Sequence, residues 1–175
     1  MITDGTTEAG IDSKLGALCV IQGEHHEVHE GEFFTLSHFY SDVADNGNAD
    51  LHIIVGAGKE LHVTITVVGE ANAEVLIYEG TTYNAAGTAE PIHDKNRVTA
   101  NTSNALAKHT PTINTLGTVR HHSFLPGGTK KAAIGSVRSN GQEWIFKKSV
   151  DYLIRITNRG GADKDFSIEI EFYEV

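Results

Sequence analysis

The sequence predicts an all-β protein, a jelly roll or antiparallel β-sandwich with long loops and an extended N-terminal arm. Three observations lead to this prediction. Many short segments alternate apolar and polar residues, which is the period of a strand with one face toward solvent. Polar or glycine-bearing turns separate these segments, and the chain contains 18 glycines. Helical periodicity is almost absent, and Thr, Asn, Val and Ile are plentiful, a mixture that favours strands and turns.

The clearest alternation lies in the last third of the chain. In Tyr152–Thr157 and in Phe166–Phe172 the apolar residues fall on one face, and a polar, glycine-bearing turn at 158–165 separates the two segments. We therefore expect an antiparallel hairpin at the centre of a sheet. Its phase is fixed, because a shift by one residue would bury two carboxylates, Glu169 and Glu171.

The length of 175 residues suits one domain preceded by an arm. Residues 1–16 are polar and aperiodic and are expected to form the arm, and 17–175 the single β-sandwich domain. No run of about 18 apolar residues predicts a membrane span, and the first residues lack the pattern of a secretory signal. Cys19 is the only cysteine, so an internal disulfide is impossible; we expect it to be a small buried hydrophobic side chain.

Eight or nine short strands are expected in chain order. The segment 79–116 has little periodicity, so it is expected to be a long loop, in which Ala105–Lys108 could form one helical turn. A second loop is expected at 129–141. The remaining segments are read as strands or strand starts: 17–21, 33–40, 51–55, 61–67, 73–78, 117–124 and 144–146, before the two C-terminal strands.

The charge of the chain argues against one class of partner. The formal net charge is −9 with histidine neutral. Nonspecific nucleic-acid binding depends on Lys and Arg that neutralise phosphates, so we expect no nucleic-acid partner. The same charge favours solubility and mutual repulsion of free copies.

A histidine-rich segment at Glu24–Gly31 is the most unusual local composition. His25, His26 and His29 lie among Glu24, Glu27 and Glu30. A zincin requires His-Glu-x-x-His on a helix, and the spacing here is one residue short. On a strand His25, Glu27 and His29 would share a face that could hold a cation, but the His-x-His of a cupin is absent. We expect a solvent-exposed or interfacial strand that titrates near neutral pH.

Other candidate motifs are better explained by structure. His121 and His122 are adjacent, so on a strand they would point to opposite faces. Gly56–Lys59 lacks the full phosphate-loop spacing and is expected to be a hairpin turn. Glu169 and Glu171 suit a solvent-facing strand surface, and Trp144 suits a core or interface anchor. The sequence therefore predicts a protein that is not an enzyme, with no catalytic, cofactor-binding or metal-binding residues.

Several stretches nevertheless resemble the head decoration, or cement, proteins of tailed bacteriophages. The most similar stretches are Gly141–Phe146, Tyr152–Arg159 and Ile168–Glu174. Shorter ones also match, and together they span most of the chain: Asp4–Thr6, His26–Gly31, Leu76–Thr81, Lys95–Arg97, Pro111–Ile113 and Leu125–Gly128. The resemblance departs at Phe146–Ser149 and in the histidine-rich segments.

The resemblance implies a jelly-roll structural protein that binds the outer surface of a capsid and stabilises the shell by bridging capsomers. Its partners would be the major capsid protein and further copies of itself, as a homotrimer, without nucleic acid, membrane or cofactor. It would be made in the bacterial cytoplasm and end in the virion. Two alternatives remain open: a carbohydrate- or receptor-binding β-sandwich of a phage virion, and a metal-dependent jelly-roll enzyme.

Overall fold

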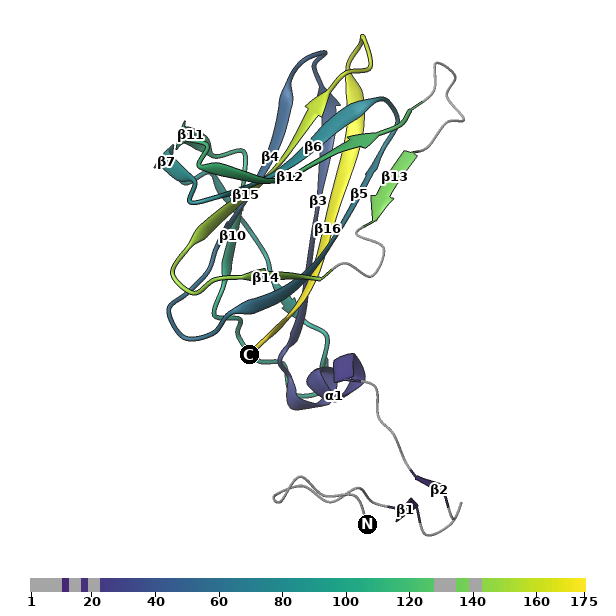
Figure 1. Cartoon of the computed structure of the whole chain (residues 1–175), viewed down its shortest axis with the longest axis vertical. Helices are drawn as coiled ribbons and strands as arrows, with labels where there is room; N and C mark the ends of the chain where they lie inside the picture. The colour runs from purple at the N-terminus through teal and green to yellow at the C-terminus, as the bar shows by residue number, and fades with distance from the viewer. Residues whose placement is uncertain (1–10, 13–16, 19–22, 128–134, 139–142) are drawn as a thin grey trace.

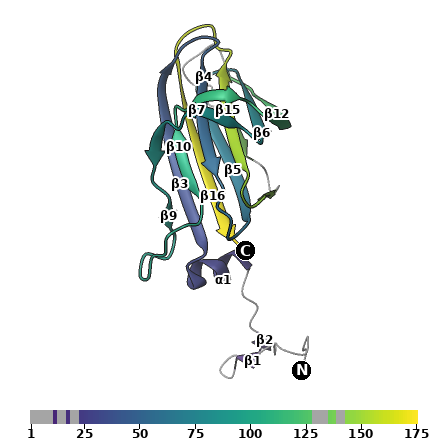
Figure 2. The same cartoon turned by 90° about the vertical axis from the view of Figure 1, so that its left-hand side faces the viewer.

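The structure, a computed structural model, describes residues 11–12, 17–18, 23–127, 135–138 and 143–175. In these residues 60% of the structure is strand and 4% is helix. Two large antiparallel sheets face each other as a β-sandwich (Figures 1 and 2). The predicted fold class is thereby confirmed.

The first sheet has the strand order β12-β6-β15-β4-β10-β8. Its strands are β4 (Asn48–Ile54), β6 (Ala73–Glu79), β8 (Thr88–Glu90), β10 (Leu106–His109), β12 (Thr118–Leu125) and β15 (Asp151–Asn158). The strand β15 is central and pairs with β4 on one side and β6 on the other.

The second sheet has the order β13-β5-β16-β3-β9, and β14 also pairs with β5. Its strands are β3 (Phe33–Val43), β5 (Leu61–Gly69), β9 (His93–Asp94), β13 (Gly135–Arg138), β14 (Trp144–Phe146) and β16 (Lys164–Glu174). The row β3-β16-β5-β13/β14 thus faces the row β4-β15-β6-β12, which is the eight-stranded arrangement of a jelly roll.

The C-terminal strands differ from the sequence prediction in one respect. The phase is correct, since Ile168, Ile170 and Phe172 are buried and Glu169 is exposed. However, β15 and β16 do not pair as a hairpin, because each is central in a different sheet. Alternation reports which face is buried and not whether the next strand lies beside it or opposite it.

The core fills the space between the sheets and consists of side chains on alternate strand positions. The rings of Phe34 and Phe172 stack with centroids 5.5 Å apart, and those of Phe146 and Tyr152 stack at 3.8 Å. The turn between β15 and β16 is tied to this body by Asn158, which is fully buried. Its Nδ2 donates to the carbonyl oxygens of Val43 and Ala162, both at 2.7 Å.

The segment 79–116, predicted to be a loop, contains five short strands. Two of them, β7 (Thr82–Ala85) and β11 (Thr112–Thr115), form a separate small sheet. The helical turn that Ala105–Lys108 could have formed, without further helical pattern to sustain it, is not present, because Leu106–His109 is strand β10. Pairing with β4 satisfies the backbone of β10, so it needs no strong sequence period of its own.

Before β3 the expected strand is a helix. The histidine-rich segment forms α1 (Gly23–Glu30), with β1 (Ile11–Asp12) and β2 (Ala17–Leu18) preceding it as a short pair. Glu and His tolerate a helix well, and the segment lacks β-branched runs. Most of the expected arm 1–16, Cys19, and much of the loop 129–141 lie outside the described residues.

The turn Gly56–Lys59 is another correction to the sequence prediction. It joins β4 in one sheet to β5 in the other, so it is a connection between sheets and not a hairpin turn. A phosphate loop would require a helix directly after the lysine, and β5 follows instead.

Candidate functional site

One group of potential metal ligands lies among the described residues: His38, Glu90 and His109. His38 belongs to β3, where Phe34, Leu36 and Tyr40 are buried on the inner face. Alternation places His38 on that same face. An imidazole therefore occupies an inward position at which the alternation predicts another apolar side chain.

Glu90 and His109 approach from the other sheet. Glu90 ends β8 and is paired with the buried Ala107 of β10, and His109 lies two residues further along β10. Residues two apart on a strand share a face, and cross-strand partners do too. Both side chains therefore point inward, toward β3, at the edge of the sandwich formed by β8 and β10.

The three side chains are close together. Nδ1 of His38 lies 2.5 Å from Oε2 of Glu90, and the three potential ligand atoms all lie within 4.8 Å of one another. The rings of His38 and His109 are stacked, with centroids 4.0 Å apart and 17° between their planes. The side chains of His38 and Glu90 are 20% and 14% exposed, so this cluster is sheltered but reachable from solvent.

The electrostatics of the cluster favour neutral imidazole at His109. Burial lowers the pKa of His109, the neighbouring His38 lowers it further, and Glu90 partly opposes this. Tyr40 lies beside the group, with its ring edge-on to His38 at 4.4 Å. Burial, with Asp50 and Glu90 nearby, raises the pKa of Tyr40, so its hydroxyl stays protonated and donates to the carbonyl of Asp50 at 2.7 Å.

A fully buried histidine lies on the outer face of the first sheet. His52 of β4 is fully buried, its Nε2 lies 3.0 Å from Oδ2 of Asp151, and its Nδ1 has no hydrogen-bond partner. The ring of Tyr83 in β7 lies edge-on to it at 4.9 Å. Burial lowers the pKa of His52, although Asp151 acts in the opposite direction. The small β7-β11 sheet thus helps to cover a neutral imidazole.

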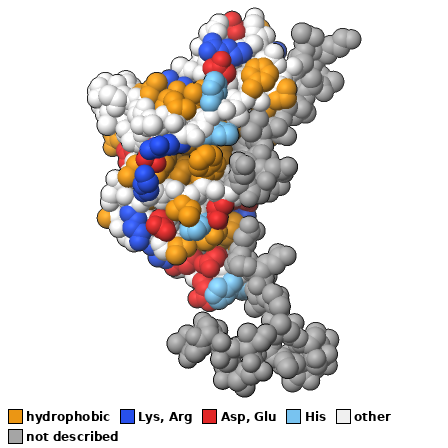
Figure 3. Space-filling view, in the orientation of Figure 1, with side chains coloured by type: hydrophobic (Ala, Val, Ile, Leu, Met, Phe, Trp, Pro, Cys, Tyr) orange, Lys and Arg blue, Asp and Glu red, His pale blue; other side chains and the backbone are white. Residues whose placement is uncertain are grey.

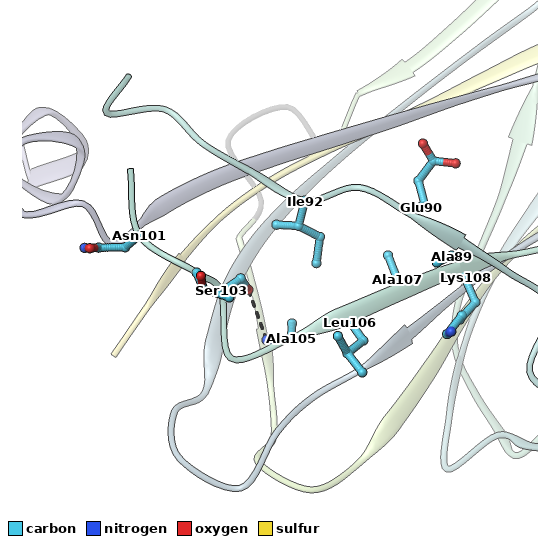
Figure 4. Close-up of a pocket in the computed structure, with 10 residues that line it drawn as sticks. Ala89, Glu90, Ile92, Asn101, Ser103, Ala105, Leu106, Ala107 and Lys108 are labelled. Carbon is cyan, nitrogen blue, oxygen red and sulfur yellow. Dashed lines mark hydrogen bonds between the residues drawn. The ribbon is translucent and has the colours of Figure 1, made fainter. Parts of the chain in front are cut away.

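A hollow of about 240 Å³ adjoins the cluster. It lies between the segments 89–92 and 101–108, and Glu90 is one of its lining residues (Figure 4). In this view the carboxylate of Glu90 and the side chain of Lys108 extend to opposite sides of the paired strands. Lys108 therefore does not form an ion pair with Glu90 in this arrangement, and the carboxylate can interact with the two histidines.

Two buried carboxylates fix the segment that contains Glu90 and His109. Asp94, 2% exposed, accepts from the backbone N–H groups of Asn96 and Asn101 at 2.7 and 2.6 Å. Glu174, 4% exposed, accepts from the hydroxyl of Ser103 and the N–H of Asn104 at 2.6 and 2.8 Å. Asp94 thus fixes the conformation inside the segment that lacked sequence periodicity, and Glu174 of β16 ties that segment to the body of the sandwich.

The histidines of α1 do not join this cluster. His26 and His29 are three residues apart on the helix and both are exposed. The expectation that His25, Glu27 and His29 share a strand face is wrong, because this segment is helical. The segment therefore offers surface imidazoles at its described positions and not an enclosed ligand set.

The other residues singled out in the sequence are separated from one another. His121 and His122 lie on β12 with different environments, since His121 is half-buried against Trp144 with ring centroids 5.5 Å apart and His122 is exposed. Trp144 packs against the core, as predicted. Glu169 is exposed, and Glu171 forms an ion pair with Lys95. None of these positions is part of the His38 group.

Sequence reasoning missed His38, Glu90 and His109. Glu90 and His109 lie in the segment read as a loop, and they meet His38 only through pairing between distant strands. One signal was available: His38 breaks an apolar alternation at an inward position. Its partners could not be identified without the register of β8 and β10.

Comparisons with known proteins add no identification. The chain matches no known family model, and no curated protein or solved structure matches it. No helix among the described residues is long and apolar enough to cross a membrane.

Proposed function

We propose that the protein is a decoration, or cement, protein that binds the outer surface of a bacteriophage capsid and stabilises the shell by bridging capsomers. The resemblance of the C-terminal third to that group motivates the proposal, and the jelly-roll fold is compatible with it. The single observation that carries it furthest is the presence of exposed apolar side chains on the outer face of an edge strand.

This edge surface is the outer face of β12, the last strand on this side of its sheet. It exposes two large apolar side chains, Val119 (48% exposed) and Phe124 (56%), whose partners Tyr78 and Glu74 lie on the face of β6 away from the core. On the opposite, inward side of β12, the ring of His121 contacts Trp144 of β14 in the other sheet. Several hydrophobic side chains are visible on the face that carries these strands (Figure 3).

Such a surface suits contact with another protein. The strand β12 ends its sheet on this side, so part of its backbone is unpaired in the described structure. Burial of exposed apolar side chains on an edge strand by a partner is favourable and stabilises the complex. Many identical contacts over a shell then act together, so that each can be weak while attachment is firm.

Homotrimerisation is part of the proposal. A net charge of −9 opposes close approach of free copies, so the contacts between them must supply compensating apolar burial. The edge surface supplies candidate groups for these contacts or for contacts with the capsid.

The alternative of a carbohydrate-binding module has less support. A sugar site is expected to use exposed aromatic side chains in the long loops. In the described segment 79–116 the aromatic residue is Tyr83, and its ring is directed onto the buried His52. It is therefore partly used for packing.

The test is attachment to capsids of the phage that encodes the chain, prepared without this protein. The purified protein should co-sediment with these capsids at saturable stoichiometry and raise the temperature at which the shells disrupt. In solution its mass should be three times 18.9 kDa. Absence of co-sedimentation at micromolar protein would refute the proposal.

A pair of variants tests the edge surface. Phe124→Asp places a charge on the edge surface and should reduce capsid binding about tenfold or more, because a desolvated charge at a contact costs several kcal/mol. Phe39→Asp is the matched control, since Phe39 is 61% exposed on β3 of the other sheet. Equal loss of binding in both variants would contradict the assignment of this surface.

A further inference from the structure

We propose that His38, Glu90 and His109 bind a divalent transition-metal ion, with Zn²⁺ the best fit, which links the two sheets at the β3, β8 and β10 edge. Two imidazole nitrogens and one carboxylate oxygen form a ligand set that Zn²⁺ uses, with a fourth position left for water or another ligand. Ligand atoms within 4.8 Å of one another can surround an ion with bonds of about 2.0–2.2 Å.

Two of the three ligands are already held in place. His38 is fixed between the edge-on ring of Tyr40 and the carboxylate of Glu90. Tyr40 is itself anchored by its hydrogen bond to the carbonyl of Asp50 on the facing sheet. This support orients the first imidazole in the way that outer residues orient metal ligands in known sites.

The third ligand must adjust. Stacked rings carry nitrogen lone pairs in nearly parallel planes, so one ring has to tilt before both can point to one ion. His109 is the ring that can do this, because its hydrogen bond is a 3.2 Å contact with the hydroxyl of the adjacent Thr110. A rotation about its side-chain torsions replaces the stack with convergence on the ion.

The charges support a cation at this position. The carboxylate of Glu90 lies close to both imidazoles, and a bound ion would take the place of the hydrogen bond between Nδ1 of His38 and Oε2 of Glu90. Hard cations such as Ca²⁺ prefer sets made only of oxygen ligands and fit less well.

The structural consequence is a cross-link between parts of the chain that are distant in sequence. His38 and Glu90 are 52 residues apart. An ion bound only by the folded state stabilises that state by mass action. The ion would therefore hold the polar segment 82–115 against β3. At this edge of the sandwich few large apolar side chains hold the two together. This inference does not depend on the proposed attachment to a capsid.

The experiment uses the full chain, stripped with a chelator and dialysed against Zn²⁺. Elemental analysis should find one ion per chain that is lost in His109→Ala and in Glu90→Gln, with affinity at least about tenfold weaker in each. Thermal melting should shift upward with Zn²⁺ in the parent protein and not in these variants. Co²⁺ in place of Zn²⁺ should give visible absorption bands of a low-symmetry, four-coordinate site.

The controls separate this site from surface histidines. His122→Ala removes an exposed histidine on β12 and should leave binding unchanged. The double variant His26→Ala/His29→Ala removes two exposed imidazoles of α1 and should also bind one ion at the same affinity. Each variant is first shown by circular dichroism to fold without metal.

Three outcomes would overturn the proposal. The first is no stoichiometric Zn²⁺ in the parent protein. The second is binding retained at the same affinity in His109→Ala and Glu90→Gln. The third is binding lost in the α1 double variant, which would assign the ion to that helix.

Discussion

The C-terminal strands β15 and β16 and the segment 82–115 are held in the fold by different means. In β15 and β16 apolar side chains alternate, and nearly every inward position is fully buried. In 82–115 the strands are two to four residues long, and buried carboxylates and backbone pairing fix their positions. The difference teaches that a regular period specifies the body of a sandwich, whereas specific polar contacts specify the segments at its edge.

The largest effect is expected from the core of the C-terminal strands. Phe172→Ala removes a ring that is 2% exposed and stacks on Phe34, so it should lower the free energy of unfolding by about 3–5 kcal/mol. Urea unfolding followed by fluorescence would measure this change. Glu169→Ala on the exposed face of the same strand is the control and should change stability by less than about 0.5 kcal/mol.

A comparable cost for both substitutions would contradict the assigned phase of β16. It would mean that both faces of the strand contribute equally to stability. That result does not fit a strand in which Ile168, Ile170 and Phe172 are buried on one face only.

The next effect concerns the polar anchors of 82–115. Asp94→Ala leaves the part-buried N–H groups of Asn96 and Asn101 without their acceptor, so it should lower the free energy of unfolding by about 1–3 kcal/mol in total. The change should be local, so hydrogen exchange should accelerate at these two amides more than in β15 or β16. Asp163→Ala, at an exposed position in the β15–β16 turn, is the matched control.

Uniform acceleration of exchange across the sandwich would contradict this local role. It would indicate that Asp94 contributes to global stability in the manner of a core residue, and the contrast between the two regions would then be lost.

The contrast also explains what the sequence could predict. The period of Phe166–Phe172 is visible without any partner, so the burial of Ile168 and the exposure of Glu169 followed directly. The fold class followed from several such segments. The sheet to which each strand belongs did not follow, because β15 and β16 have the same pattern that two paired strands would have.

The candidate metal cluster required information that no local pattern carries. Glu90 faces His38 because β8 pairs with β10 and β10 pairs with β4, so its position depends on two successive registers. The helix α1 was missed for a different reason. Its eight residues have no apolar stripe, so neither helical nor strand periodicity was available in Gly23–Glu30.

The smallest effect expected is a pH dependence of stability that arises from His52. This residue lies where β4 of the sandwich body contacts the small β7-β11 sheet of the segment 82–115. Burial lowers the folded-state pKa of His52 below its usual value of about 6.5, against the pull of Asp151 and with a further lowering by Lys108. Between the two pKa values the unfolded chain binds more protons than the folded one. Stability is therefore complete above about pH 6.5 and falls as the pH drops through this window.

The measurement is the free energy of unfolding between pH 7.5 and about 5, compared between the parent protein and His52→Gln. The variant cannot take up this proton, so its stability should fall less steeply with acid. His109, whose pKa is also lowered by burial, remains in both proteins and cancels in the difference. His122→Gln, on the exposed face of β12, should retain the parent slope. Identical slopes in the parent and His52→Gln would show that the imidazole beneath Tyr83 takes up a proton without cost, so that the β7-β11 sheet does not exclude water from it.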